Sequence, residues 1–107
     1  MRRGDLLTIA LQGDLGKPRP ALVIQSDLFD LHPSVTVLPL TSRLHDAPLV
    51  RITLQPSSRN GLREPSQVMV DKPSSVLRER LGPVFGHVGD ETLLAVNRAL
   101  AVFLGLA

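Results

Sequence analysis

Residues 16–27 read GKPRPALVIQSD, and the rest of the chain can be understood outward from this stretch. A glycine and two prolines disfavour a helix or a central strand in its first half, which is therefore an irregular, basic approach. The apolar run 21–24 that follows is typical of a buried strand. Arg19 therefore stands at the edge of a sheet, beside a loop, where a fixed cation can meet an anionic ligand.

Short segments with β-branched and alternating apolar residues surround this stretch and predict further strands. The segment 4–11 is apolar on both faces, as a central or sandwiched strand would be. Loop 12–18 is long for a hairpin, and Ser26 or Asp27 could cap a turn of helix over 27–33. We expect strands over residues 4–11, 19–26, 34–40, 49–54, 65–71 and 82–87, with a turn through Arg80 in place of strand after Pro73.

The C-terminal segment 90–104 predicts the one long helix, since its apolar residues recur at helical spacing. Asp90 is a favourable N-cap, and Gly105 can supply the left-handed residue that ends the helix. Leu94 and Val102 widen the apolar stripe beyond what one sheet face needs. Five or six short strands and one helix predict a mainly β fold with α, a small antiparallel barrel or sheet on which the helix packs.

Composition limits the class of protein. With 107 residues, 43% of them apolar, we expect one domain over 1–107. Cysteine is absent, which excludes disulfides and thiolate metal sites and suits a cytoplasmic protein. We expect no signal peptide and no membrane span, because the longest apolar stretch, 93–106, contains Asn97 and Arg98.

Positive charge is unevenly distributed along the chain. The formal net charge is only +2, yet residues 43–63 contain four arginines (43, 51, 59 and 63) and one acid, Asp46. Such a local excess is expected of a protein with an anionic partner, nucleic acid included. The same pattern also fits a solvated loop whose arginines bind nothing.

Several kinds of catalytic site find little support. The three histidines (32, 45 and 87) are isolated, so we expect no metal and no cofactor. There is no nucleophile elbow, and the glycines near Lys17 lack the spacing of a phosphate-binding loop. Arginine and hydroxyl groups remain, and they suit RNA, which carries its own nucleophile in the 2′-hydroxyl.

A ribonuclease of this kind must hold the scissile phosphate in line and stabilise its charge. Arg19 offers a rigid fork of donors for phosphate, and Thr41 offers a hydroxyl donor. The two would meet if the strands that begin at Arg19 and end near Thr41 are antiparallel neighbours. Alternatively, Arg19 is a loop-edge residue bound to water or a carboxylate, and Thr41 closes a turn.

Several segments, in this order, resemble the MazF/PemK family of toxins from bacterial toxin–antitoxin pairs. They are R-R-G-D-L-L at 2–7, R-P-A-L-V at 19–23, P-L-T-S at 39–42, P-S-Q-V-M-V-D-K at 65–72, R-L-G at 80–82 and the terminal helix. The resemblance implies an SH3-like antiparallel barrel and a homodimer. It also implies a metal-independent, sequence-specific endoribonuclease that cleaves single-stranded RNA, such as mRNA, to a cyclic phosphate and a 5′-hydroxyl, and that a cognate antitoxin inhibits.

Carried over by position, Arg19 and Thr41 match the family's catalytic arginine and threonine. Lys17 falls in the loop that covers the RNA groove in this family. The expected RNA-binding residues are Lys17, Ser42, Arg43, Gln67 and Asp71.

The chain departs from the family at two places. The tryptophan common in the first strand is absent, and Met69 stands where some members have arginine. Two other functions stay open: a catalytically silent module that binds RNA or antitoxin, and a gyrase poison like CcdB. The last is disfavoured because the final helix lacks the tryptophan that such poisons use.

Overall fold

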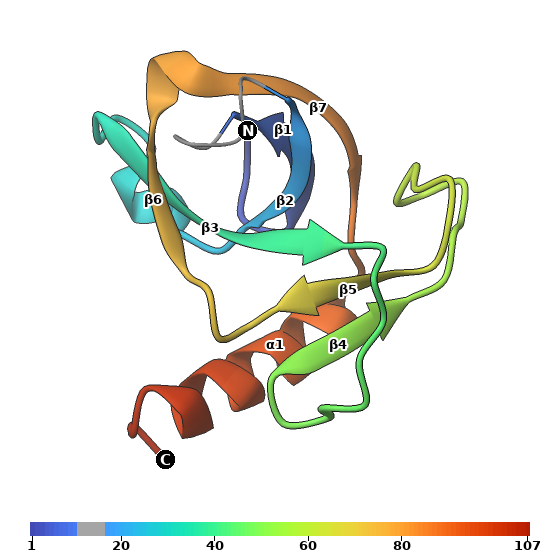
Figure 1. Cartoon of the computed structure of the whole chain (residues 1–107). Helices are drawn as coiled ribbons and strands as arrows, with labels where there is room; N and C mark the ends of the chain where they lie inside the picture. The colour runs from blue at the N-terminus through green and yellow to red at the C-terminus, as the bar shows by residue number, and fades with distance from the viewer. Residues whose placement is uncertain (11–16) are drawn as a thin grey trace.

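The computed structural model describes residues 1–10 and 17–107 as a mainly antiparallel sheet followed by one long helix (Figure 1). The predicted end of the first strand at Leu11 and most of the predicted loop 12–18 lie outside the described residues. The elements are β1 (Asp5–Ile9), β2 (Arg19–Val23), η1 (Asp27–Phe29), β3 (Ser34–Thr41), β4 (Arg51–Leu54), β5 (Ser66–Met69), β6 (Ser74–Leu77), η2 (Arg78–Arg80), β7 (Leu81–His87) and α1 (Asp90–Phe103).

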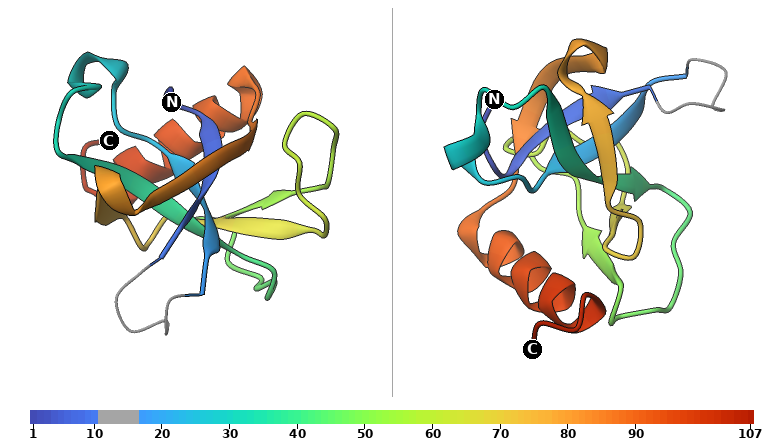
Figure 2. Two further views of the ribbon diagram at one scale, coloured as in Figure 1. Left: turned by 90° about the horizontal axis from the view of Figure 1, so that it is seen from above. Right: turned by 90° about the vertical axis from the view of Figure 1, so that its left-hand side faces the viewer.

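Strand β3 is the centre of the sheet. It pairs antiparallel with β2 along one edge, and with β6 and then β5 along the other. The hydrogen-bonded order is β4-β5-β3-β2-β1-β7, with β6 beside the first half of β3. In the described part of the chain the two ends of this order, β4 and β7, do not pair, so the expected barrel is a curled sheet without hydrogen-bonded closure (Figure 2).

The prediction of a turn after Pro73 is wrong, because Ser74–Leu77 forms strand β6. Its four residues pair with the start of β3, and Val76 is buried opposite Val35. The serines resemble a turn in sequence, but the backbone partner offered by β3 lies about forty residues away in the chain. Tertiary pairing therefore outweighs the local preference of Ser74 and Ser75.

Both faces of the sheet are buried, as the pattern of the first strand predicted. Even-numbered residues of β1, β2 and β3 face α1 and form one cluster with residues of β4, β5, the segments that follow β5 and β7, and α1. Its members are Leu6, Leu22, Leu38, Leu40, Leu54, Val68, Val70, Val88 and Val96. Odd-numbered residues point the other way, into the curl of the sheet, and form a second cluster of Leu7, Ile9, Ala21, Val23, Val35, Val37 and Val76. The alternation of side chains along a strand produces this division.

Helix α1 lies below β5 and beside β4 in Figure 1 and packs on the first cluster through the fully buried Val96. Its N-cap is Gly89, which corrects the prediction of Asp90; Asp90 is the first helical residue and still complements the helix dipole. Gly105 has a φ of +76°, and this confirms the predicted left-handed end.

The N-terminus is tied to the helix and to η1 by one arginine. Arg3 donates from its backbone nitrogen to Asp27 Oδ1 at 2.7 Å and from Nη2 to Asn97 Oδ1 at 2.6 Å. Ser26 caps η1 by accepting from Leu28 N, as predicted. Of the helices in residues 1–10 and 17–107, none is long and apolar enough to cross a membrane.

Candidate active site

Strands β2 and β3 bring Arg19 and Thr41 to the same end of the sheet. The two strands are antiparallel neighbours with Ala21 opposite Pro39. Continuing this register by two residues places Arg19, the first residue of β2, opposite Thr41, the last of β3. The expectation that these strands would carry both residues to one edge is confirmed.

A cavity of about 430 Å³ opens at this edge. Two of the segments that line it, Lys17–Pro20 and Leu40–Ser42, contain predicted site residues. A third segment, which leads into β5, adds Leu62, Arg63, Glu64 and Ser66. The structure therefore brings together four of the predicted site residues, Lys17, Arg19, Thr41 and Ser42, and adds a cation and a carboxylate that were not predicted to belong there.

The Thr41 hydroxyl is oriented by the backbone that follows it. Its Oγ1 accepts a hydrogen bond from Arg43 N at 3.1 Å. Accepting this bond uses a lone pair of the oxygen and leaves the hydroxyl hydrogen to be donated to a ligand in the cavity. The turn-closing role considered from the sequence and a ligand-binding role are therefore compatible in the same side chain.

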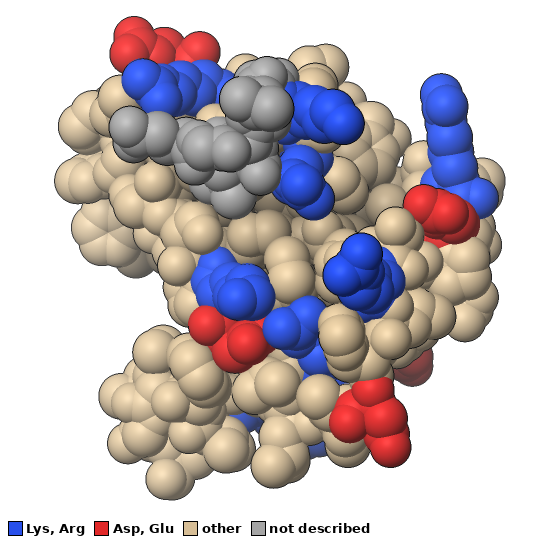
Figure 3. All heavy atoms as spheres, in the orientation of Figure 1, with Lys and Arg blue, Asp and Glu red and all other residues tan. Residues whose placement is uncertain are grey.

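Positive charge lines the cavity. Arg19 is exposed on its rim, and Lys17 and Arg63 line the same space. Figure 3 shows Lys and Arg side chains over the middle of one face of the molecule, with Asp and Glu mainly toward its margin. Guanidinium groups present donors in a fork that matches phosphate oxygens, so the cavity suits a phosphodiester.

Gln67 lies directly opposite Thr41 in the β3–β5 pair but is buried rather than presented to the cavity. Its amide accepts from His45 N at 3.0 Å and donates to His45 O at 2.9 Å and Thr53 Oγ1 at 3.1 Å. The side chain thus ties the loop after β3 to strand β4, and its predicted contact with RNA stays a prediction.

Asp71 is not among the residues that line this cavity, and it pairs with Arg51 instead. Arg51 Nη2 donates to Asp71 Oδ2 at 3.3 Å, and Nε lies 3.2 Å from Oδ1 without the alignment of a hydrogen bond. Both side chains are largely shielded, with 13% and 27% of their surface exposed. Any RNA contact by Asp71 would therefore compete with an ion pair.

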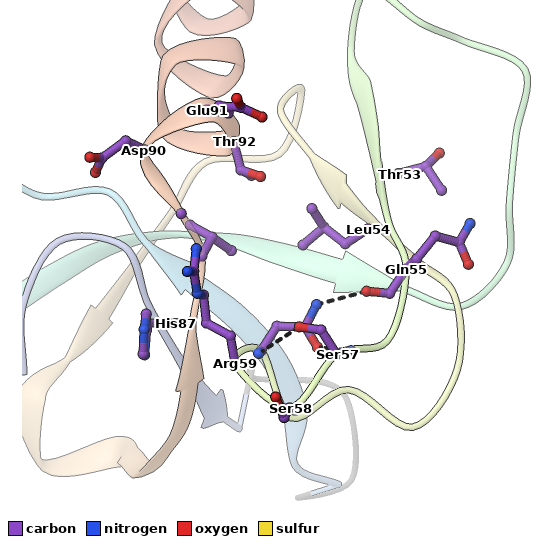
Figure 4. Close-up of a pocket in the computed structure, with 13 residues that line it drawn as sticks. Thr53, Leu54, Gln55, Ser57, Ser58, Arg59, His87, Asp90, Glu91 and Thr92 are labelled. Atoms are coloured by element: carbon purple, nitrogen blue, oxygen red, sulfur yellow. Dashed lines mark hydrogen bonds between the residues drawn. The ribbon is translucent and has the colours of Figure 1, made fainter.

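The arginines of residues 43–63 do not form one patch. Arg43 follows Thr41, Arg51 is paired with Asp71, and Arg63 lines the cavity described above. Arg59 lines a separate cavity of about 640 Å³ between the loop after β4 and the start of α1. Figure 4 shows that Asp90 and Glu91 belong to this second cavity, so its charge is mixed.

Two residues that line the cavity, Arg63 and Glu64, were not predicted from the sequence. Arg63 could have been considered, since it belongs to the local excess of arginine that indicated an anionic partner. Nothing in the sequence pointed to Glu64, because it lies in a turn region and only the β3–β5 pairing brings that region beside Thr41.

Comparison with known proteins gives the family of the chain. Residues 2–104 match the family model of the PemK-like, MazF-like toxin of type II toxin–antitoxin systems. The chain is 46% identical to the probable endoribonuclease MazF of Mycolicibacterium smegmatis, over all of this chain and 99% of that protein. It is 27% identical to endoribonuclease EndoA of Bacillus subtilis, over 99% of this chain and 96% of that one.

Solved structures show the same fold. An endoribonuclease from a mycobacterial species, in complex with its cognate antitoxin, superposes with a TM-score of 0.83 at 25% identity, over all of this chain and 97% of that one. Mycobacterium tuberculosis toxin MazF-mt6 gives 0.82 at 23% identity, over 96% and 98% of the two chains. The chain therefore belongs to the PemK-like, MazF-like family of type II toxin–antitoxin toxins.

Proposed function

We propose that this chain is the toxin of a toxin–antitoxin pair and a metal-independent endoribonuclease that cleaves single-stranded RNA at a specific sequence. The observation that carries the proposal is the cavity at the sheet edge, where Arg19 and Thr41 stand opposite each other. Relatives named as endoribonucleases, at 46% and 27% identity over nearly the whole chain, support it.

The chemistry follows from these groups. The 2′-oxygen of the RNA attacks the adjacent phosphorus and the bond to the 5′-oxygen breaks, which leaves a cyclic phosphate and a 5′-hydroxyl. Arg19 stabilises the charge that builds on the phosphoryl oxygens, and Thr41 donates a hydrogen bond to the same oxygens. Arginine is always protonated and cannot serve as the base. Its role is therefore electrostatic, and the leaving oxygen takes its proton from Arg19 or from water.

RNA would enter across the basic rim of the cavity. Lys17 and Ser42 line it, and the exposed Arg43 lies one residue beyond Ser42. We propose these three as RNA contacts. Gln67 and Asp71 are proposed as further contacts, and each would have to break its present hydrogen bonds before it could bind RNA. Aromatic side chains are scarce, three phenylalanines in all, so recognition would depend on hydrogen bonds more than on base stacking.

We propose a cognate antitoxin and a second copy of the chain as protein partners. A structural relative at 25% identity was solved with its antitoxin, which supports the first. Exposed apolar residues on α1 and after it, Leu94, Val102, Phe103, Leu104 and Leu106, support the second, because such a surface favours association. With mRNA as its proposed substrate, the protein would act in the cytoplasm.

The test is incubation of the purified protein with several long single-stranded RNAs in EDTA. We expect discrete cleavage by the wild type and loss of about 10²–10³-fold in rate in Arg19→Ala, since one electrostatic donor is removed. Arg80→Ala, an exposed arginine of η2 that does not line the cavity, is the matched control and should cleave normally. Intact RNA with every substrate would contradict the proposal and favour the silent binding module.

A further inference from the structure

The proposed reaction requires a base to remove the proton of the 2′-hydroxyl, and neither Arg19 nor Thr41 can serve. A guanidinium has no acceptor atom, and a threonine hydroxyl is a very weak base. Among the described residues that line the cavity, one side chain can accept a proton at neutral pH, the carboxylate of Glu64. The charged groups that share the cavity with it are Lys17, Arg19 and Arg63.

The pairing of β3 with β5 brings the segment that contains Glu64 to the same sheet edge as Thr41. Glu64 lies three residues before Gln67, which pairs directly with Thr41 across β3 and β5. The buried Ser66 donates from Oγ to the Glu64 carbonyl oxygen at 3.0 Å, and Pro65 restricts the backbone between them. Its position relative to Thr41 is therefore set by the sheet and by a short, restrained connection.

The other acid expected near RNA is less suited. Asp71 is engaged by Arg51 and does not line the cavity, whereas Glu64 lines it beside Arg19 and Thr41. We infer that Glu64 is the general base of the proposed ribonuclease, an inference that rests on the proposed function. The Glu64 carboxylate takes the proton of the 2′-hydroxyl as the oxygen–phosphorus bond forms. It returns that proton to water after the 5′-oxygen has left.

The experiment compares wild type, Glu64→Gln and the control Glu79→Gln, an exposed glutamate of η2. The cleavage site is first mapped on long RNAs, and a short RNA spanning it is then used for kinetics across pH. If Glu64 is the base, the wild-type rate should fall at acid pH, and Glu64→Gln should remove that fall while lowering kcat by about 10²–10⁴-fold with little change in KM. Glu79→Gln should match the wild type in both.

A substrate with sulfur in place of the bridging 5′-oxygen separates a base from an acid. A thiolate leaves without protonation. On this substrate a variant that lacks the general acid should therefore cleave at the wild-type rate, whereas a variant that lacks the general base should still be slow. We therefore expect the defect of Glu64→Gln to remain on this substrate. Binding of the same RNA with a 2′-deoxy nucleotide at the cleaved position should be unchanged.

Three results would overturn the inference. One is a kcat of Glu64→Gln within about threefold of wild type, far below the usual cost of losing a general base. Another is weaker binding of the 2′-deoxy RNA at normal kcat, which would make Glu64 an RNA contact. A third is rescue by the sulfur substrate. A wild type that cleaves no RNA would overturn the proposed function and this inference with it, whereas an active wild type with an equally active Glu64→Gln overturns only the inference.

Discussion

Strand register places Arg19 opposite Thr41, although twenty-one residues lie between them in the sequence. The hydroxyl of Thr41 is positioned by Arg43 N and retains a hydrogen for donation. In the proposed mechanism this donor acts on the charge that develops during cleavage, so its removal should lower the rate more than the affinity.

Thr41→Val removes the hydroxyl while keeping a branched side chain, and we expect the rate of RNA cleavage to fall by about 10²-fold. Thr41→Ser keeps the donor and serves as the control, with a rate within a few-fold of wild type. Single-turnover cleavage at saturating enzyme measures both. Equal rates for the valine and serine variants would remove Thr41 from the mechanism.

The ion pair of Arg51 and Asp71 should contribute to the stability of the fold. Asp71→Asn leaves a guanidinium that is only 13% exposed without its charged partner, so we expect the free energy of unfolding to fall by about 1–3 kcal/mol. Asp46→Asn, an exposed acid, should have no such effect. Urea unfolding measures the difference. A variant that keeps full stability but loses RNA affinity would instead make Asp71 chiefly an RNA contact.

Residues placed by the local strand pattern could be predicted from the sequence, and residues placed by contacts between distant segments could not. Arg19 and Thr41 could be located because a strand begins at one and ends at the other. Glu64 could not, because its place depends on the pairing of Thr41 with Gln67, a contact between distant segments. The burial of Gln67 was also invisible, since its amide partners belong to the loop after β3 and to β4.

Among the elements, α1 and the central strands were predictable because apolar residues recur in them at the spacing of a helix or of a two-sided strand. Strand β6 was not, because Pro73, Ser74 and Ser75 locally favour a turn and only β3 supplies their partner. In strand β7, Gly86 allows another segment to approach closely. The backbone of Asn60 approaches it closely from the loop after β4.

Gly86 and Gly89 form a matched pair for testing this contact. A Cβ at Gly86 would lie 2.3 Å from Asn60 O, a backbone atom, whereas one at Gly89 would lie 2.6 Å from Nη1 at the end of the flexible Arg59 side chain. We expect Gly86→Ala to lower the free energy of unfolding by about 1–3 kcal/mol and Gly89→Ala by less. Thermal or urea unfolding followed by circular dichroism measures both. A Gly86→Ala variant that keeps full stability would contradict the close approach of Asn60 to β7.

Over the molecule as a whole, three cations and one carboxylate, Glu64, gather where the sheet edge opens. Lys17, Arg19 and Arg63 line the candidate active-site cavity, while Arg51 is paired with Asp71 and Arg59 lines a second cavity together with Asp90 and Glu91. The modest net charge of +2 therefore understates the local field that an RNA strand would meet.

This distribution predicts the salt dependence of RNA binding. If the three cavity cations each neutralise one phosphate, the logarithm of the association constant for a non-cleavable RNA should fall with the logarithm of salt concentration with a slope of about −2. Arg63→Ala should make that slope shallower by about 0.7, and Arg80→Ala should leave it unchanged. Fluorescence anisotropy at several salt concentrations measures it. An identical slope for Arg63→Ala would show that Arg63 does not meet the RNA backbone.

The most direct test of the account is cleavage of an RNA oligonucleotide carrying a single 2′-deoxy nucleotide on the 5′ side of the mapped cleavage site. If the substrate's own 2′-hydroxyl is the nucleophile held by Arg19 and Thr41, this oligonucleotide will bind but stay intact. The unmodified RNA will give a 2′,3′-cyclic phosphate and a 5′-hydroxyl, identified by mass spectrometry. Cleavage of the deoxy oligonucleotide, or products with a 5′-phosphate, would contradict the account.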